Sequence, residues 1–550
     1  MRGHRKNWSG LLSVLAVWVV AACAQPQPQP VVDESPVPHK QAAEMFLAGY
    51  THIAEKYIEK TPVAQLAMEG IRGLGSIAPA LIVKRVENKI FLATSNVMPD
   101  AEPDAGPDEE PAYFKAPADD DIKGWAALTV KIWSEGRKAS KELFNSSPEK
   151  LYEAVFDGAL SKLDIYSRYS GLREATRNRA RRDGFGGIGI RFKVSSKTVR
   201  ITSIIKKTPA ARSGLRVGDL ILRVGSIPVT GLSARDVSDQ LRGRIDSRVK
   251  LTVSRGSEPT PQKFILERHL IVTPTVKAKF NDGIVFMKIS SFNQQTSRDL
   301  AKKIRHTRKV HVSKVRGVVL DLRGNPGGLL NQAIKIADLF LDHGKIVSTR
   351  GRHPESIQYY EASGRDIAQG LPLILLLDGR SASSSEVLAA ALQDQGRAVI
   401  IGTTSFGKGT VQTVIRMPNN GEITLTWSRL YSPAGYVLHG LGLRPNFCTS
   451  GSSEMKQKDL FASVANENLV RRAYKTWRST GFYEQTQRSK LRANCPAERR
   501  KEAIEVRAAR NLLNNVELYA RALELATFDA KKPVEEAIKV PNENKTKEPQ

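Results

Sequence analysis

The sequence predicts a multidomain α/β protein with a helical region near each end. Three observations support this prediction. Apolar residues recur at helical spacing in residues 41–95 and again from 125 to about 163. Short strands follow one another through residues 184–269, and strands then alternate with helices from 282 to about 430. At 550 residues, with 41% hydrophobic and 25% charged residues, the chain is too long for one ordinary core, so we expect three or more globular domains.

The N-terminus is typical of an export signal. A positively charged start precedes an apolar run, Leu11–Ala22, that is too short to span a bilayer comfortably. The run leads into Cys23, and this pattern resembles the bacterial lipobox, whose cysteine becomes the lipidated first residue of the mature protein. An ordinary cleavage site beside an accidental cysteine is the alternative. We expect a membrane-anchored lipoprotein of the bacterial periplasm, and Ala24 is compatible with the outer membrane.

The formal net charge of +28 bears on partners rather than on the fold. Its simplest interpretation is a soluble basic protein. Alternatively, one face binds anionic membrane lipid, an anionic wall polymer or an acidic partner. Nucleic acid is not expected, because the export signal directs the chain out of the cytoplasm. No cysteine or histidine spacing suggests a metal site, and we expect no cofactor.

Two cysteines, Cys448 and Cys495, remain once Cys23 is assigned to lipid. In an oxidising compartment they could close a long loop as one disulfide. Two unpaired thiols are the alternative.

Residues 100–122 interrupt the N-terminal helical pattern. The stretch is acidic and rich in proline, so we predict that it is disordered. On either side of it, Thr61-Pro62 and Ser147-Pro148 each predict a helix N-cap followed by proline at the first helical position. The polar stretch 531–550 is also predicted to be disordered.

A glycine-rich run from Gly184 to Gly189 fits the letters of the dinucleotide fingerprint but not its context. A nucleotide site needs a buried strand before the glycines and a helix after them. Here an arginine-rich run precedes the glycines and a strand, Ile188–Phe192, follows them. Nucleotide binding is therefore not expected.

The segment Thr208–Ile221, Thr-Pro-Ala-Ala-Arg-Ser-Gly-Leu-Arg-Val-Gly-Asp-Leu-Ile, closely resembles the PDZ pattern. In PDZ domains a glycine-containing loop offers backbone N–H groups to a peptide's terminal carboxylate, and the peptide adds as a strand. A small β-domain that only spaces other parts is the alternative. The peptide-binding candidates are Gly184, Phe185, Gly186, Gly187, Ile188, Gly189 and Ile190.

Three glycine- and serine-rich turns carry the candidate chemistry: Asp321–Gly328, Asp378–Glu386 and Ser405–Gln412. A serine hydroxyl needs a nearby base to become a nucleophile. A lysine can be that base only if burial or a neighbour lowers its pKa toward neutrality. Lys408 lies between two glycines in the third turn, which suits such a site. The first turn joins a buried strand to a helix, a geometry that can stabilise an oxyanion.

These turns, in this order and after a PDZ module, resemble the carboxyl-terminal processing (tail-specific) proteases, PDZ-containing Ser-Lys serine peptidases of the S41 type. The resemblance covers roughly residues 140–447 and implies an α/β core of the crotonase/Clp-like type. It also implies that Ser383 is the nucleophile, Lys408 the general base and Gln412 the residue that orients Lys408. The spacings of these three residues match the family. The N–H groups of Gly328 and Ser384 would be the oxyanion donors.

Two departures from the family pattern stand out. Ser384 occupies a position where alanine is usual, so Ser381, Ser384 and Ser385 compete with Ser383 for the role of nucleophile. Ser383 is favoured by its register against Glu386 and by its spacing to Lys408. Asn446 stands where aspartate is usual, which bears on the substrate channel and leaves the dyad intact.

The resemblance predicts a periplasmic serine endopeptidase that cuts proteins with apolar C-termini through an acyl-enzyme, with the PDZ domain recognising the substrate or gating the site. It also implies cell-wall hydrolases as substrates and a helical-repeat adaptor lipoprotein as a partner, docking on the basic helices of residues 455–528; an oligomer is compatible with this. A catalytically idle PDZ scaffold or an envelope adaptor lipoprotein is the alternative.

The predicted segments are a signal peptide (1–22), a lipid-anchor linker (23–40), an N-terminal helical region (41–99), an acidic linker (100–122), a second helical region (123–183), the PDZ domain (184–269), the peptidase core (270–447), a basic helical C-terminal region (448–530) and a disordered tail (531–550).

Overall fold

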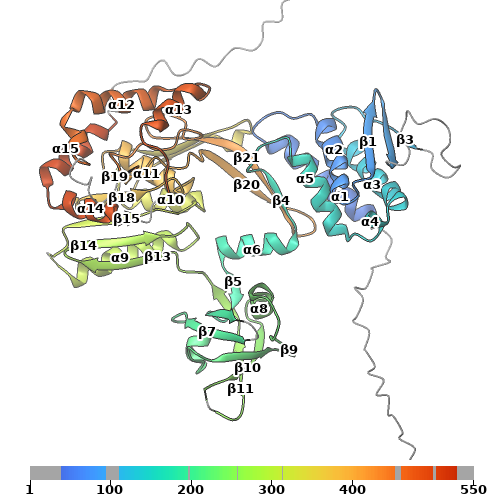
Figure 1. Ribbon diagram of the computed structural model, residues 1–550, viewed down its shortest axis with the longest axis horizontal. Coiled ribbons are helices and arrows are strands. Elements are labelled where there is room, and N and C mark those ends of the chain that lie inside the picture. The colour runs from blue at the N-terminus through green and yellow to red at the C-terminus, as the bar shows by residue number, and fades with distance from the viewer. Residues whose placement is uncertain are drawn as a thin grey trace, which may run out of the picture.

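The computed structural model describes residues 39–94, 111–195, 198–256, 258–312, 314–451, 460–499 and 503–528. The export signal, Cys23 and the tail 531–550 lie outside these residues. Figure 1 shows a central α/β core covered by C-terminal helices, an N-terminal helical region at the far end of two long strands, and a smaller β-rich module. Among the described residues, no helix is long and apolar enough to cross a membrane.

The N-terminal region is a helical layer around an aromatic core. Phe46, Trp125, Trp133 and Phe156 are fully buried in it, and Phe46 contacts both Trp133 and Phe156. Ser147 caps α5 by accepting the Lys150 N–H, with Pro148 at the first helical position as predicted. The helices are α1 (His39–Lys56), α2 (Val63–Arg72), α3 (Ile122–Ala139), α4 (Lys141–Phe144) and α5 (Pro148–Leu160).

Three features of this region differ from the sequence expectations. An antiparallel sheet of β1 (Leu81–Val86), β2 (Lys89–Thr94) and β3 (Ala112–Lys115) packs on the helices. The prediction of disorder over residues 100–122 is therefore wrong for 111–122, because Phe114 of β3 is buried and anchors the end of the acidic stretch. At α2 the N-cap is Pro62 itself and makes no side-chain hydrogen bond, so the predicted Thr61 cap is wrong by one residue.

The predicted PDZ domain is a compact β-module with its own core. Its sheet has the order β11-β10-β8-β7-β6, which leaves β6 at an edge beside α8. The entering strand β5 pairs with the leaving strand β12, which runs from the predicted end of the domain at His269 to Ile271. The elements are β5 (Phe185–Gly187), β6 (Ile190–Ser195), β7 (Thr198–Ile204), α7 (Pro209–Arg212), β8 (Leu220–Val224), β9 (Ile227–Pro228), α8 (Ala234–Leu241), β10 (Arg248–Ser254), β11 (Gln262–Glu267) and β12 (His269–Ile271).

The core contains a six-stranded sheet of order β13-β14-β15-β18-β19-β22, parallel from β14 onward. Its central strand β18, Leu-Ile-Leu-Leu-Leu, is buried on both faces, as expected for a covered parallel sheet. The elements are β13 (Val276–Asn281), β14 (Ile284–Ile289), α9 (Thr296–Val310), β15 (Gly317–Asp321), α10 (Leu330–Asp338), β18 (Leu373–Leu377), α11 (Ser384–Asp394), β19 (Val399–Gly402) and β22 (Phe447–Cys448).

A second sheet connects the core to the rest of the molecule. Its long strand β21 pairs with β20 on one side and with β16 and β4 on the other, and it extends toward the N-terminal helices (Figure 1). Ile58, just after α1, donates its N–H to the Thr426 carbonyl of β21. The elements are β4 (Arg168–Ser170), β16 (Lys345–Arg350), β17 (Gln358–Glu361), β20 (Thr410–Arg416) and β21 (Glu422–Tyr431).

Helix α6 (Leu172–Asp183) joins β4 to the PDZ module, as Figure 1 shows. Arg179 and Arg182 of this helix form ion pairs of 3.0 and 2.7 Å with Glu422, whose side chain is only 4% exposed. A buried carboxylate needs such partners, because an unpaired charge is costly away from water. The module is thus attached through a helix that is anchored at the start of β21.

The C-terminal helices cover one face of the main sheet. Leu512 of α14 and Leu525 of α15 belong to the same buried cluster as strand residues Ile374, Val399 and Phe447. Cys448 and Cys495 form a disulfide, with their Cα atoms 6.0 Å apart, so the structure selects the paired alternative. The helices are α12 (Glu467–Ser479), α13 (Gln485–Ala493), α14 (Ile504–Leu513) and α15 (Val516–Ala526).

Candidate active site

Ser383 lies in the turn between β18 and α11, directly before the first residue of the helix. Its φ of +54° is in the left-handed region that a residue with a side chain rarely adopts. Such a strained turn projects the serine from the sheet edge, and the positive end of α11 favours negative charge there. The buried apolar strand and the fully buried helix hold the turn from both sides.

The hydroxyls of the three competing serines are all bonded to the main chain. Ser381 donates to the Leu322 carbonyl at 2.9 Å, Ser384 to the Gly328 carbonyl at 3.0 Å and Ser385 to the Asn325 carbonyl at 3.0 Å. These bonds tie the serine turn to the Asp321–Gly328 turn. Because those hydroxyls have structural partners, the arrangement favours Ser383 as the nucleophile.

Gly327 and Gly328 bring the predicted oxyanion donors beside Ser383. A Cβ atom on Gly327 would lie 3.0 Å from Ser383 Cβ and 2.8 Å from the Ala382 carbonyl oxygen. Only glycine allows this approach, and its φ of +100° also favours glycine. Within the described residues, the N–H groups of Gly328 and Ser384 donate to no protein acceptor. Both groups are therefore available to a developing oxyanion.

Glu386 links the serine turn to the lysine turn. Its Oε2 accepts the N–H of Ser383 at 2.8 Å and the N–H of Lys408 at 2.9 Å. Its Oε1 accepts the Ser405 hydroxyl at 2.5 Å and the Gly407 N–H at 2.6 Å. Burial raises the pKa of this carboxyl, and the four hydrogen bonds oppose that rise. Glu386 was predicted from the sequence only as the register mark for Ser383, and its bridging role was not predicted.

Lys408 occupies a site that lowers the pKa of its amine. Burial is the main cause, and the Arg168 guanidinium adds to it, while the carboxylates of Asp164 and Glu386 act in the opposite direction. A lowered pKa is what a lysine needs to act as a general base. Nζ lies 4.5 Å from the centroid of the Tyr166 ring.

Two predicted contacts of Lys408 are not made in this structure. No hydrogen bond joins its Nζ to Ser383 Oγ or to Gln412. Gln412, on β20, donates instead to the hydroxyls of Thr410 at 2.9 Å and Thr426 at 3.3 Å. The structure therefore brings the backbones of the dyad together through Glu386, with the lysine side chain directed to Tyr166.

The PDZ candidates line two cavities at the edge of their module. Five of them border a cavity of about 390 Å³ between β6 and α8: Phe185, Gly187, Ile188, Gly189 and Ile190. Gly184 and Gly186 instead border a neighbouring cavity of about 660 Å³ between α6 and α8. The Arg242 guanidinium lies 4.3 Å from the Phe185 ring, between the two cavities. Because β6 is an edge strand, an extended peptide can pair with it in the first cavity.

Asn446, the other departure from the family pattern, is a structural residue. Its Oδ1 accepts the Ile400 N–H and the Gln393 amide, and its Nδ2 donates to the Ala522 carbonyl at 2.7 Å. A carboxylate could not donate that third bond. The amide therefore joins β19 and α11 to the C-terminal helix α15.

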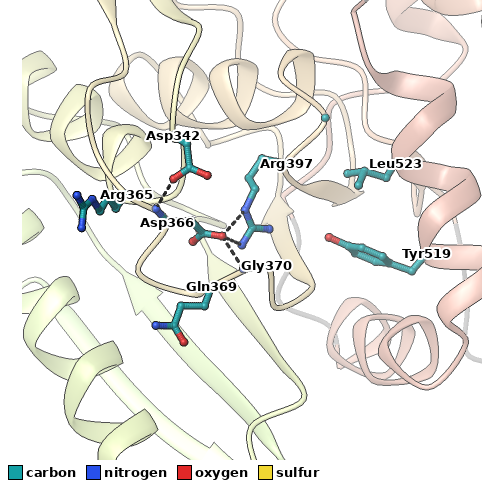
Figure 2. Close-up of a pocket in the computed structure, with 9 residues that line it drawn as sticks. Asp342, Arg365, Asp366, Gln369, Gly370, Arg397, Tyr519 and Leu523 are labelled. Carbon is teal, nitrogen blue, oxygen red and sulfur yellow. Dashed lines mark hydrogen bonds and ion pairs between the residues drawn. The ribbon is translucent and has the colours of Figure 1, made fainter.

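Figure 2 shows a third cavity, of about 650 Å³. It lies just beyond the C-terminal end of α11, the end opposite Ser383. Two of its charged groups are paired with each other: Arg397 contacts Asp366 at 3.0 Å, and Asp366 also accepts the Gly370 N–H. The contacts stabilise the loop before β18, and we assign no chemistry to this cavity.

Two protein families match two separate parts of the chain, the α/β core and the β-rich module. Residues 283–448 match peptidase family S41, and residues 186–261 match the PDZ domain. A carboxy-terminal-processing protease from Bartonella bacilliformis is 36% identical over 323 residues, which cover 58% of this chain and 74% of that protein. The chain belongs to peptidase family S41.

Other relatives of this S41 peptidase carry similar names. A probable CtpA-like serine protease from Staphylococcus aureus is 34% identical over 303 residues, 54% of this chain and 60% of that protein. Among solved structures, the photosystem II D1 C-terminal processing protease is 23% identical, covers 74% of this chain and 92% of its own, and has a TM-score of 0.37. The predictions of a PDZ domain, a mixed helix and sheet fold and a C-terminal processing serine protease are confirmed.

Proposed function

We propose that the protein is a periplasmic, membrane-anchored endopeptidase that cuts polypeptides near their C-termini through a Ser383–Lys408 acyl-enzyme mechanism. The observation that supports this most directly is the position of Glu386. One oxygen of its buried carboxylate accepts the backbone N–H of both residues, so a single anchor fixes the nucleophile relative to the base.

In the proposed mechanism, the neutral amine of Lys408 accepts the proton of Ser383 Oγ as that oxygen attacks the peptide carbonyl carbon. The N–H groups of Gly328 and Ser384 stabilise the resulting oxyanion. The Lys408 ammonium then gives its proton to the leaving amine as the C–N bond breaks. Water attacks the ester, Lys408 takes the water proton, and Ser383 is regenerated with release of the new carboxylate.

The lysine side chain has to leave Tyr166 for this reaction, and we propose that peptide binding to the PDZ domain promotes that change. Helix α6 supplies a mechanical route, since it leads into β5 and is paired with Glu422 at the start of β21. Strand β21 in turn pairs with β20, which begins two residues after Lys408. Deletion of residues 184–269 should alter turnover or specificity, and unchanged values of both would contradict the gating role.

The cellular setting is proposed from the sequence pattern. Lipidation of Cys23 would place the enzyme on a periplasmic membrane surface, with the outer membrane favoured. We further propose cell-wall hydrolases as a substrate class and a helical-repeat adaptor lipoprotein that docks on the basic helices of residues 455–528. Binding of such an adaptor to the mature chain should weaken as salt rises, and salt-insensitive binding would argue against a charge-based dock.

The test uses residues 24–550, the mature chain without its lipid-bearing Cys23, with Ser383→Ala and Lys408→Ala as variants. Cleavage of an unfolded protein with an apolar C-terminus is followed with and without a periplasmic extract. We expect cleavage by the wild type and none by either variant. Activity that persists in Ser383→Ala would show that another serine is the nucleophile. A wild type that stays inactive even with extract would favour the catalytically idle PDZ scaffold.

A further inference from the structure

The ring of Tyr166 lies directly beside the Lys408 ammonium. Nζ lies 4.5 Å from the ring centroid, within the range of a cation–π contact. In the described part of the chain, Lys408 forms no ion pair. The two residues lie in segments far apart in the sequence, the loop between α5 and β4 and the loop before β20.

Tyr166 is held in a rigid turn built on one carboxylate. Asp164 Oδ1 accepts the N–H of Tyr166 at 2.7 Å and the N–H of Ser167 at 3.1 Å. The same oxygen accepts the hydroxyl of Thr426 at 3.0 Å, which ties the turn to β21. The ring position is therefore fixed to the strand that pairs with β20.

A second ring supports Tyr166 from the side. The His439 imidazole meets it edge-on, with ring centroids 6.2 Å apart, and Phe482 lies next to His439 at 6.1 Å. Burial lowers the pKa of His439, and the guanidinium groups of Arg429 and Arg488 add to this effect. This lowering favours the neutral imidazole beside Lys408.

The charged groups that face Lys408 come from three segments. Asp164 and Arg168 lie in the loop before β4 and at its start, and Glu386 lies in the first turn of α11. The two carboxylates favour the ammonium, whereas Arg168 and burial favour the neutral amine. The Tyr166 ring also favours the ammonium, because the negative face of the ring attracts a cation but not a neutral amine.

We propose that Tyr166 is a positioning residue for the general base: its ring holds the Lys408 ammonium and releases the amine once the proton is lost. The ring therefore helps to set the pH at which Lys408 becomes available to Ser383. This inference rests on the proposed Ser-Lys mechanism. A contact of this type raises the pKa of the bound amine relative to the same site without the ring.

The first test measures kcat/KM against pH for the mature chain and three variants. Tyr166→Leu removes the ring, so the midpoint of the acidic limb should fall by roughly 0.4–1.5 pH units. Tyr166→Phe keeps the ring and should keep the wild-type midpoint, as should the control Ile165→Ala, because Ile165 is 87% exposed. An unchanged midpoint in Tyr166→Leu, with activity lowered equally at every pH, would show a merely structural role. An equal shift in Tyr166→Phe would assign the effect to the hydroxyl. Either result overturns the proposal.

A second test does not depend on proteolysis. In the Ser383→Ala chain, acetic anhydride reacts with the neutral but not the protonated form of each accessible amine. Digestion and mass spectrometry then follow the extent of modification at Lys408 alone against pH. Adding Tyr166→Leu should move the modification midpoint to lower pH by the same amount, and no movement would refute the ring contact. If Lys408→Ala retained full protease activity, the proposed mechanism would fail, while this titration would still decide the role of Tyr166.

Discussion

Replacement of Glu386 by glutamine tests the link between the two catalytic turns. The carboxylate accepts two hydrogen bonds on each oxygen, and glutamine replaces one oxygen with an NH₂ group that can only donate. If the NH₂ group faces Ser405 and Gly407, the hydroxyl can turn to accept, but the Gly407 N–H loses its partner. In the opposite orientation, the N–H groups of both Ser383 and Lys408 lose theirs.

Each buried N–H left without an acceptor costs about 1–3 kcal/mol. Glu386→Gln should adopt the less costly orientation and lower the free energy of unfolding by about 1–3 kcal/mol. Without the hydrogen bond from the Gly407 N–H to residue 386, the loop that carries Lys408 should shift. A displacement near 1 Å should lower kcat by about 10²-fold. Urea unfolding and kcat on an unfolded substrate measure the two effects, with the exposed Glu142→Gln as the control. A Glu386→Gln enzyme with wild-type stability and wild-type kcat would refute the bridging role.

Three further predictions concern the disulfide, the serine turn and pH. The Cys448→Ser/Cys495→Ser chain should lose about 2–4 kcal/mol of free energy of unfolding in urea, because the disulfide closes a loop with a sequence separation of 47. A loss under 1 kcal/mol would mean that packing alone holds the C-terminal helices on the core. Gly327→Ala should lower kcat by about 10²-fold, because the added Cβ would displace Ser383. The control Gly324→Ala is also at positive φ but has open space around its Cβ, so it should keep most activity. Equal losses of kcat in the two variants would point to backbone strain alone. The wild-type kcat/KM should rise with pH along its acidic limb, because only the neutral Lys408 amine accepts a proton and burial lowers its pKa; a rate that falls as pH rises through this limb would exclude that role.

The sequence predicted the local chemistry of the site better than its contacts. The turns that hold Ser383 and Lys408, and the strand and helix that flank Ser383, follow from glycine placement and buried apolar runs. The hydrogen bonds to main-chain carbonyls from the hydroxyls of Ser381, Ser384 and Ser385 could not be predicted. They depend on how two turns that are distant in the sequence pack together.

Other features escaped prediction because tertiary contacts decide them. Strand β3 follows an acidic, proline-rich stretch, and it is ordered because Phe114 finds a buried site against helices that come later in the chain. The contact between Lys408 and Tyr166 likewise requires β4 to pair with β21. For Glu386, a signal was present: a carboxyl three residues after a nucleophile, at the start of a fully buried helix, must find hydrogen-bond donors.

The most direct test of the central claim is to trap and map the acyl-enzyme. The mature chain is mixed with a p-nitrophenyl ester of a short apolar peptide, quenched in acid and digested for mass spectrometry. We predict one added acyl group on Ser383, and no adduct in Ser383→Ala. An adduct on Ser381, Ser384 or Ser385, or continued turnover without any adduct on serine, would contradict the account.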